Sequence, residues 1–191
     1  MQIESVTFFG GANLQVGSVA YSALENLGKQ LAVVNDVKIV TGALGGAMEA
    51  PAKGASSVGG KTIGYTFLGL GCNPYIKEKI DCSTFSEEKL LMELQYGVRL
   101  GQLLSSDAFI FAEGNAGTLT ELMAVMNFNG RGWKPQKKVA FIDPNGVWVK
   151  TLDALKENGF ISESALLPVR IFCNPASQAQ EIVEWLNEET E

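Results

Sequence analysis

The chain has 191 residues, of which 46% are hydrophobic and 19% charged, and this balance supports a folded core and excludes global disorder. Its 15 Lys and Arg against 21 Asp and Glu give a net charge of −6, which argues against nucleic-acid or membrane-surface partners, because those need clustered positive charge. Histidine is absent, so Ser-His-Asp catalysis, Cys-His catalysis and His-containing zinc sites are excluded.

The length fits one domain, and we predict a single nucleotide-binding domain over residues 1–191. No run approaches the length of about 20 apolar residues that crosses a bilayer. The N-terminal "MQIESVTFF" has no basic region or cleavage pattern, which predicts that there is no secretion signal. Three cysteines without a CxxC pair suit reduced thiols, so we expect a cytoplasmic protein.

Short apolar runs alternate with helical periods along the whole chain, and a glycine-rich turn often separates the two. The expected elements, in chain order, are a strand at 3–10, a helix at 18–34, a strand at 37–42, a short helix at 46–55, a strand at 61–68, a helix at 86–106, a strand at 107–111, a helix at 117–129, a strand at 137–143, a helix at 146–159, a strand at 169–173 and a helix at 176–189.

Two details of this pattern bear on the boundaries and on the least regular region. Ser86, followed by two glutamates, is a plausible N-cap for the sixth element, and Gly159 suits the position just after a helix end. Residues 69–86 are rich in turn residues, and we expect them to cross the ligand face as a loop with a short extended piece.

Six strand–helix units, with several strands apolar on both faces, predict the fold class. We expect an α/β protein with a doubly wound, mostly parallel sheet, arranged as a Rossmann-like three-layer sandwich. In such a sheet, ligands bind beyond the carboxyl ends of the strands, where the strand order reverses.

Three glycine-bearing loops follow predicted strands and should share that edge: "FGGAN", "TGALGGAME" and "EGNAGT". Glycine lets the backbone approach a phosphate closely, and a helix N-terminus adds N–H groups and positive dipole. Each loop alone also fits an ordinary tight turn, but three on one edge favour an anion site. The expected phosphate or nucleotide contacts are Gly10, Gly11, Gly45, Gly46, Gly114, Asn115, Gly117 and Thr118.

Two charged residues are candidates for chemistry beside these loops. Glu121 lies one helical turn beyond Gly117 and Thr118, so it should face the same side as the loop, although it could equally stabilise the helix start. Arg99 lies late in the helix before "DAFIF" and could contact a ligand, cap a helix or join an interface. Glu49 is a second carboxylate, for which we favour a structural role.

Three long stretches of the sequence form one recognisable pattern: "ALENLGKQLAVVNDVKIVTGALGGAMEAPAKGA", "SSDAFIFAEGNAGTLTELMAVM" and "KKVAFIDPNGVWVKTLDALKENGFIS". This pattern resembles the lonely-guy family of phosphoribohydrolases, and the resemblance covers nearly the whole chain. The related molybdenum-cofactor carrier proteins share the fold and the glycine loops, and "GGAMEAPAKGA" resembles them equally.

The resemblance implies a Rossmann-like homodimer that cleaves the N-glycosidic bond of nucleoside 5′-monophosphates without a metal or cofactor. In the family signature PGGxGTxxE, Gly114, Gly117, Thr118 and Glu121 match, whereas Glu113 replaces the proline and Asn115 the second glycine. By the same resemblance Glu121 and Arg99 would be the catalytic pair, although Leu100 stands where active members carry lysine.

Two functions therefore remain open from the sequence. The first is a hydrolase that releases free base and ribose 5-phosphate from a small phosphorylated ligand. The second is a non-catalytic carrier of a nucleotide or of molybdenum cofactor, which the departures at Glu113, Asn115 and Leu100 favour. A lysine decarboxylase is set aside, since no lysine has an evident pyridoxal-binding context.

Overall fold

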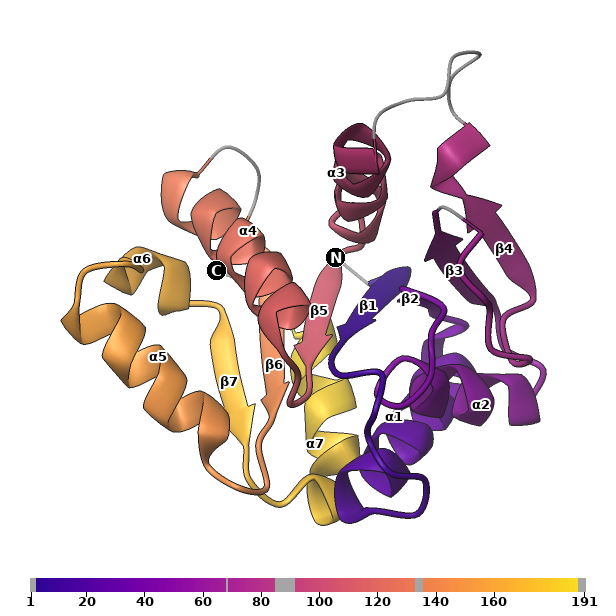
Figure 1. The fold of residues 1–191 in the computed structure, drawn as a ribbon. Coiled ribbons are helices and arrows are strands. Elements are labelled where there is room, and N and C mark those ends of the chain that lie inside the picture. The colour runs from indigo at the N-terminus through magenta and orange to yellow at the C-terminus, as the bar shows by residue number, and fades with distance from the viewer. Residues whose placement is uncertain (1–2, 68, 85–91, 133–135, 189–191) are drawn as a thin grey trace.

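The computed structural model describes residues 3–67, 69–84, 92–132 and 136–188, which form a seven-stranded sheet with helices on both faces (Figure 1). The elements in chain order are β1 (Ser5–Phe9), α1 (Val19–Asn35), β2 (Lys38–Thr41), α2 (Glu49–Ser57), β3 (Thr62–Thr66), β4 (Glu78–Asp81), the short helix η1 (Cys82–Thr84), α3 (Met92–Leu103), β5 (Ala108–Phe111), α4 (Ala116–Arg131), β6 (Lys138–Ile142), α5 (Val147–Glu157), α6 (Glu163–Leu166), β7 (Val169–Phe172) and α7 (Pro175–Asn187).

All strands of the sheet run parallel, in the order β4-β3-β2-β1-β5-β6-β7. The chain builds outward from β1 to β4 on one side and from β5 to β7 on the other, so the order reverses between β1 and β5. This arrangement confirms the predicted doubly wound α/β fold. It also fixes the switch point, where the loops after β1 and β5 must lie side by side.

The structure differs from the predicted elements in two places. The sequence predicts a loop with a short extended piece at 69–86, and in the structure that piece is β4, a full edge strand paired with β3. Helix α6 is absent from the prediction, because its four residues are too few for a helical period to show in the sequence. The predicted N-cap Ser86 lies outside the described residues.

Local capping explains where two long helices begin. Ser18 precedes α1, and its side chain accepts a hydrogen bond from the N–H of Tyr21 at 3.2 Å. Asn115 does the same for α4, where its Oδ1 accepts from the N–H of Gly117 at 3.4 Å. Each side chain satisfies one of the N–H groups that a helix start leaves without a partner.

The core has two apolar layers, one on each face of the sheet. Alternation along a strand separates them, because successive side chains point to opposite faces. Phe8 packs in the layer under α1, α2 and α7, whereas Phe9 packs in the layer under α3, α4 and α5. Figure 1 shows these two groups of helices on either side of the sheet.

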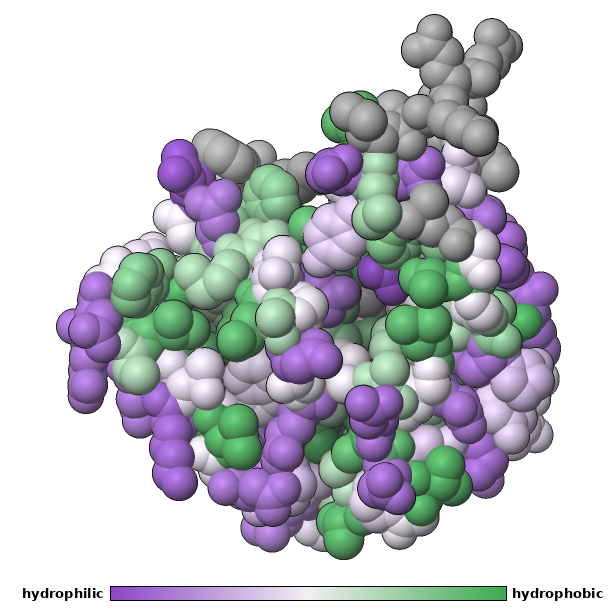
Figure 2. Space-filling view, viewed as in Figure 1, coloured by the Kyte–Doolittle hydropathy of each residue, from purple (hydrophilic) through white to green (hydrophobic). Residues whose placement is uncertain are grey.

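Within the described residues, no helix has both the length and the apolar character needed to cross a bilayer. The surface in Figure 2 is mostly polar, but hydrophobic side chains gather over α4 and α6. The exposed large apolar side chains of this region include Leu119, Phe160 and Leu167.

Candidate functional site

The loops after β1 and β5 touch at the switch point. The N–H of Gly11 donates to the carbonyl of Glu113 at 2.9 Å. A Cβ at Gly114 would lie 3.0 Å from the Gly11 nitrogen and would clash with the Thr118 side chain. The two loops therefore approach at a distance that only glycine at position 114 permits.

The loop after β2 joins them from the other side of β1. The N–H of Ala47 donates to the carbonyl of Gly11 at 3.0 Å. Gly46 has a φ of +60°, and a Cβ there would lie 2.5 Å from the same carbonyl oxygen. The structure thus brings the three glycine loops into direct contact at the carboxyl edge of the sheet.

Several backbone N–H groups at this edge have no acceptor. Among the described residues, the N–H groups of Leu44, Gly45 and Gly46 donate to nothing, and neither do those of Gly114 and Asn115. Consecutive N–H groups without partners form a concave donor surface that suits an anion. Water or a ligand must satisfy them, because backbone donors are costly to leave unpaired.

The two helix starts at this edge differ in charge. The first turn of α4 holds no acidic residue, so its positive dipole end is uncompensated. The first turn of α2 holds Glu49, whose Oε1 accepts a hydrogen bond from the hydroxyl of Tyr21 at 3.0 Å. An anionic group is therefore more favoured at the start of α4 than at the start of α2.

Thr118, in the first turn of α4, is only 3% exposed. Its side chain lies against Gly114, where a Cβ would collide with the hydroxyl. The hydroxyl therefore sits at the β5–α4 loop, the position from which it could donate to a group held by that loop.

Arg99 reaches the carboxyl edge from the middle of α3. Its Nε donates to the carbonyl of Tyr65 at 2.7 Å, and its Nη2 donates to the carbonyl of Gly42 at 3.1 Å. Its guanidinium carbon lies 5.7 Å from the centre of the Phe67 ring. The side chain is long enough to span from the helix to the ends of β2 and β3, so Arg99 reaches this edge without standing at a helix end.

The guanidinium of Arg99 is buried, at 7% exposure, and burial lowers its pKa. Two of its five N–H groups are used by the two carbonyls, and no other described residue accepts from it. A buried cation with donors to spare can bind an anionic or hydroxyl-bearing ligand, since burial makes such an interaction stronger than at the surface.

Glu121 is half-buried on α4, and no described residue donates a hydrogen bond to its carboxylate. Burial raises its pKa to about 7, and the positive charge of Arg99 opposes part of that rise. The two side chains influence each other electrostatically, yet the described structure contains no ion pair between them. A carboxylate in this state is poised to exchange a proton near neutral pH.

Glu113 replaces the proline of the family signature, and the sequence suggests that its charge would oppose an anion. In the structure, Asn145 in the β6–α5 loop donates from Nδ2 to Glu113 Oε1 at 2.7 Å. The carboxylate is thus held toward the neighbouring loop. Sequence reasoning missed Asn145, and only its place in a turn after a strand could have pointed to it.

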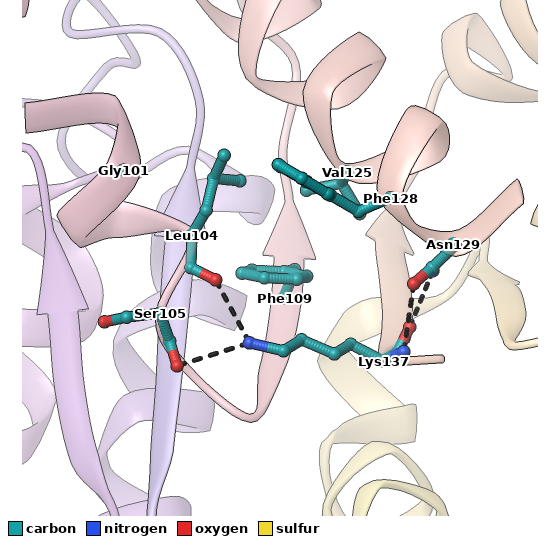
Figure 3. Close-up of a pocket in the computed structure, with 8 residues that line it drawn as sticks. All are labelled: Gly101, Leu104, Ser105, Phe109, Val125, Phe128, Asn129 and Lys137. Atoms are coloured by element: carbon teal, nitrogen blue, oxygen red, sulfur yellow. Dashed lines mark hydrogen bonds between the residues drawn. The ribbon is translucent and has the colours of Figure 1, made fainter. Parts of the chain in front are cut away.

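A cavity of about 210 Å³ lies elsewhere, between α3 and α4 near the amino ends of β5 and β6 (Figure 3). Phe109, Val125 and Phe128 form apolar walls, and Lys137 crosses its floor. The ammonium of Lys137 donates to the carbonyls of Leu104 at 3.0 Å and of Ser105 at 3.2 Å. Because backbone carbonyls occupy this lysine, the cavity offers mainly apolar surface, and it contains none of the predicted site residues.

The described residues contain no group of three or more Cys, Asp or Glu side chains arranged to hold a metal ion. Cys82 is buried, Cys72 is half-buried and Cys173 is exposed, and all three are free thiols.

A family model, the SLOG cluster 4 family, matches residues 4–131. An uncharacterized protein of Archaeoglobus fulgidus is 29% identical over 106 residues, which are 56% of this chain and 60% of that protein, so the match spans less than two thirds of the relative.

Solved structures with similar folds belong to proteins of distant sequence. The molybdenum cofactor carrier protein of Chlamydomonas reinhardtii has a TM-score of 0.64 at 19% identity, covering 98% of this chain and all of that one. The molybdenum cofactor binding protein of Rippkaea orientalis has a TM-score of 0.62 at 20% identity, covering 94% of this chain and 93% of that one. DNA processing protein A of Helicobacter pylori, which binds single-stranded DNA, has a TM-score of 0.63 at 13% identity, covering 96% of this chain and 81% of that one. At these identities the likeness shows the fold.

Proposed function

The chain belongs to the SLOG cluster 4 family, and from that premise we propose that it binds a nucleoside 5′-monophosphate at the carboxyl edge of β1, β2 and β5 and hydrolyses its N-glycosidic bond. The products would be the free base and ribose 5-phosphate. The resemblance to lonely-guy phosphoribohydrolases supports the same reaction. No metal or cofactor takes part in the proposed step.

The state of Glu121 is the observation that carries the catalytic proposal. A carboxylate with a structural role is normally paired or hydrogen-bonded when buried, because an unpaired buried charge costs free energy. Glu121 has neither kind of partner among the described residues, and its pKa is raised to about 7. Burial has therefore produced a general base matched to neutral pH.

In the proposed step, water attacks the anomeric carbon as the bond from that carbon to the base nitrogen breaks. Glu121 takes a proton from the water and, while ionised, stabilises the positive charge that develops on the sugar. The departing base leaves with the bonding electron pair and takes up a proton from solvent, and Glu121 afterwards returns to solvent the proton that it took from the attacking water. Arg99, beside Glu121, would hold a ribose or phosphate oxygen, and the donors of the glycine loops would hold the phosphate.

A panel of nucleoside 5′-monophosphates, including N6-substituted adenylates, tests this proposal with free base measured by chromatography. We expect release of base by the wild-type protein and a loss of at least about a hundredfold in Glu121→Gln, the size typical for removal of a general base. Glu157→Gln, which changes an exposed glutamate on α5, is the matched control and should retain full activity.

The pH profile adds a second check, since Glu121 must be ionised to act as the base. We expect the rate to fall as the pH drops through about 7. A Glu121→Gln variant with wild-type turnover would contradict the assignment of the chemistry.

The alternative function is a carrier that holds a nucleotide or molybdenum cofactor without turnover. The presence of Glu113 and Asn115 in place of signature residues supports it, as do the carrier proteins among the solved structures of similar fold. Mass spectrometry of the freshly purified protein tests it. A stoichiometric phosphorylated ligand, together with no base release from any panel member, would establish the carrier.

A further inference from the structure

One side chain outside the glycine loops holds the β2–α2 loop in place. Asn73, in the β3–β4 loop, donates from Nδ2 to the carbonyls of Ala43 at 3.1 Å and Leu44 at 2.9 Å. Its backbone N–H also donates to the Ala43 carbonyl, at 2.8 Å. Its Oδ1 accepts from the N–H of Tyr75 at 3.2 Å, so both ends of the amide are engaged and its orientation is fixed.

Ala43, whose carbonyl accepts two of these hydrogen bonds, has a strained backbone. Ala43 is fully buried and has a φ of +65°, in the left-handed region. That region is disfavoured for a residue with a Cβ, because the Cβ comes too close to the following carbonyl oxygen. Such a conformation persists only when its surroundings impose it. Thr41 contributes by accepting the Ala43 N–H at 3.0 Å, and Asn73 fixes the carbonyl on the other side.

The strain at Ala43 bears on the anion-binding donors of the β2–α2 loop. The N–H groups of Leu44, Gly45 and Gly46, which donate to nothing in the described structure, come directly after Ala43 in the chain. If Ala43 relaxed to a negative φ, the chain after it would turn and these donors would point in other directions. The direction of the donors therefore depends on a conformation that Ala43 does not favour by itself.

We propose that Asn73 is a positioning residue, which imposes the strained conformation of Ala43 and so keeps the Leu44–Gly46 N–H groups aligned for the phosphate of the ligand. This inference rests on the proposed function for the identity of the ligand. The contacts between Asn73 and the loop stand independently of it.

The first test needs no ligand. Asn73→Ala should speed hydrogen exchange at the Ala47 amide, which is buried and donates to Gly11 at 3.0 Å, by about tenfold, because the loop would open more often. In an Ala43→Gly background the same change should have a clearly smaller effect, because glycine adopts a positive φ without strain. Asn26→Ala, at an exposed position on α1, is the matched control and should change nothing.

The second test measures binding of adenosine 5′-monophosphate by calorimetry, with Glu121→Gln present throughout to prevent turnover. Asn73→Ala should weaken binding about tenfold, as expected if the competent loop falls to a tenth of the population. Addition of Ala43→Gly should restore most of that loss.

The outcomes separate the two proposals. Unchanged exchange at Ala47, or equal acceleration in both backgrounds, would overturn the positioning role of Asn73. Unchanged binding despite faster exchange would overturn it as well. If exchange at Ala47 responds to Asn73→Ala and Ala43→Gly as expected but the protein binds no nucleoside monophosphate, the proposed function is overturned. The ligand assigned to these donors is then overturned with it.

Discussion

At the scale of single residues, Glu121 and Arg99 show how burial can prepare a site for chemistry. Each lies where its charged form is disfavoured, and burial moves the pKa of Glu121 up and that of Arg99 down. Each also partly offsets the shift of the other, because opposite charges stabilise one another. The described residues contain no ion pair between the two, and the Arg99 guanidinium lies at the Gly42 carbonyl, at the start of the second glycine loop.

The desolvation of Glu121, which raises its pKa, should reduce stability at neutral and higher pH. Its pKa is about 7 in the folded protein against an ordinary value of 4.5, so between these values the folded state binds the extra proton. The unfolding free energy should therefore fall as the pH rises from about 4.5 to 7, and stay lowered above 7.

We accordingly predict that Glu121→Gln stabilises the protein by roughly 1–3 kcal/mol at pH 8, with a gain that shrinks toward zero near pH 4. Urea unfolding at several pH values measures the gain. Glu157→Gln on α5 is the control, and it should show no such gain in stability. A gain that is constant with pH would mean that ionisation of Glu121 is not its source.

At the scale of elements, the close contact between α1 and α2 sets the position of the β2–α2 loop. A Cβ at Gly28 of α1 would clash with the backbone of Pro51, and a Cβ at Gly54 of α2 would clash with the carbonyl of Glu25. The two helices therefore pack backbone to backbone. Because α2 begins directly after the loop, this contact also fixes where the loop can lie.

We predict that Gly54→Ala costs about 1–3 kcal/mol or more of unfolding free energy, as overpacking at a close backbone contact does. Gly97→Ala is the matched control: Gly97 is an exposed helical glycine on α3 with nothing within 4 Å of its Cβ position. Alanine there should stabilise the protein by up to about 1 kcal/mol, since it favours helix more than glycine does. Chemical denaturation of both variants measures the contrast, and equal stability would show that α1 and α2 can separate without cost.

At the scale of the whole molecule, the face in Figure 2 mixes polar and apolar side chains, and one group of apolar side chains lies around α4. Phe128 is 37% exposed at the wall of the cavity between α3 and α4. An apolar wall of this kind, open to solvent, suits a contact with a second copy of the chain. The homodimer expected from the family resemblance would then form through α4, the helix that carries Glu121.

We predict that the protein is a dimer at micromolar concentration and that Phe128→Lys shifts it toward the monomer, because a charge at an apolar interface is costly to bury. Light scattering measures the mass. Val33→Lys, which changes a 64% exposed apolar residue on α1, on the opposite face of the sheet from α4, is the matched control and should leave the dimer intact. A wild-type monomer would contradict the interface.

The sequence alone determined the order of strands and helices and the loops that carry glycine, because apolar periodicity and turn residues act over a few neighbouring positions. Since strands joined by right-handed crossovers run parallel, it also placed the loops after β1, β2 and β5 at one edge. The residues proposed there, Glu121 among them, followed from that placement and from the family resemblance.

Other features depended on contacts between residues far apart in the chain, and only the tertiary structure decided them. Edge strand β4 exists because it pairs with β3, and its own residues give a weak strand pattern. Arg99 forms a hydrogen bond with Gly42, which is 57 positions away in the sequence, and Asn73 forms one with Ala43, which is 30 positions away. Neither an arginine on a helix nor an asparagine in a loop carries a local signal of its partner, because a long-range hydrogen bond is specified by the fold that brings its two ends together.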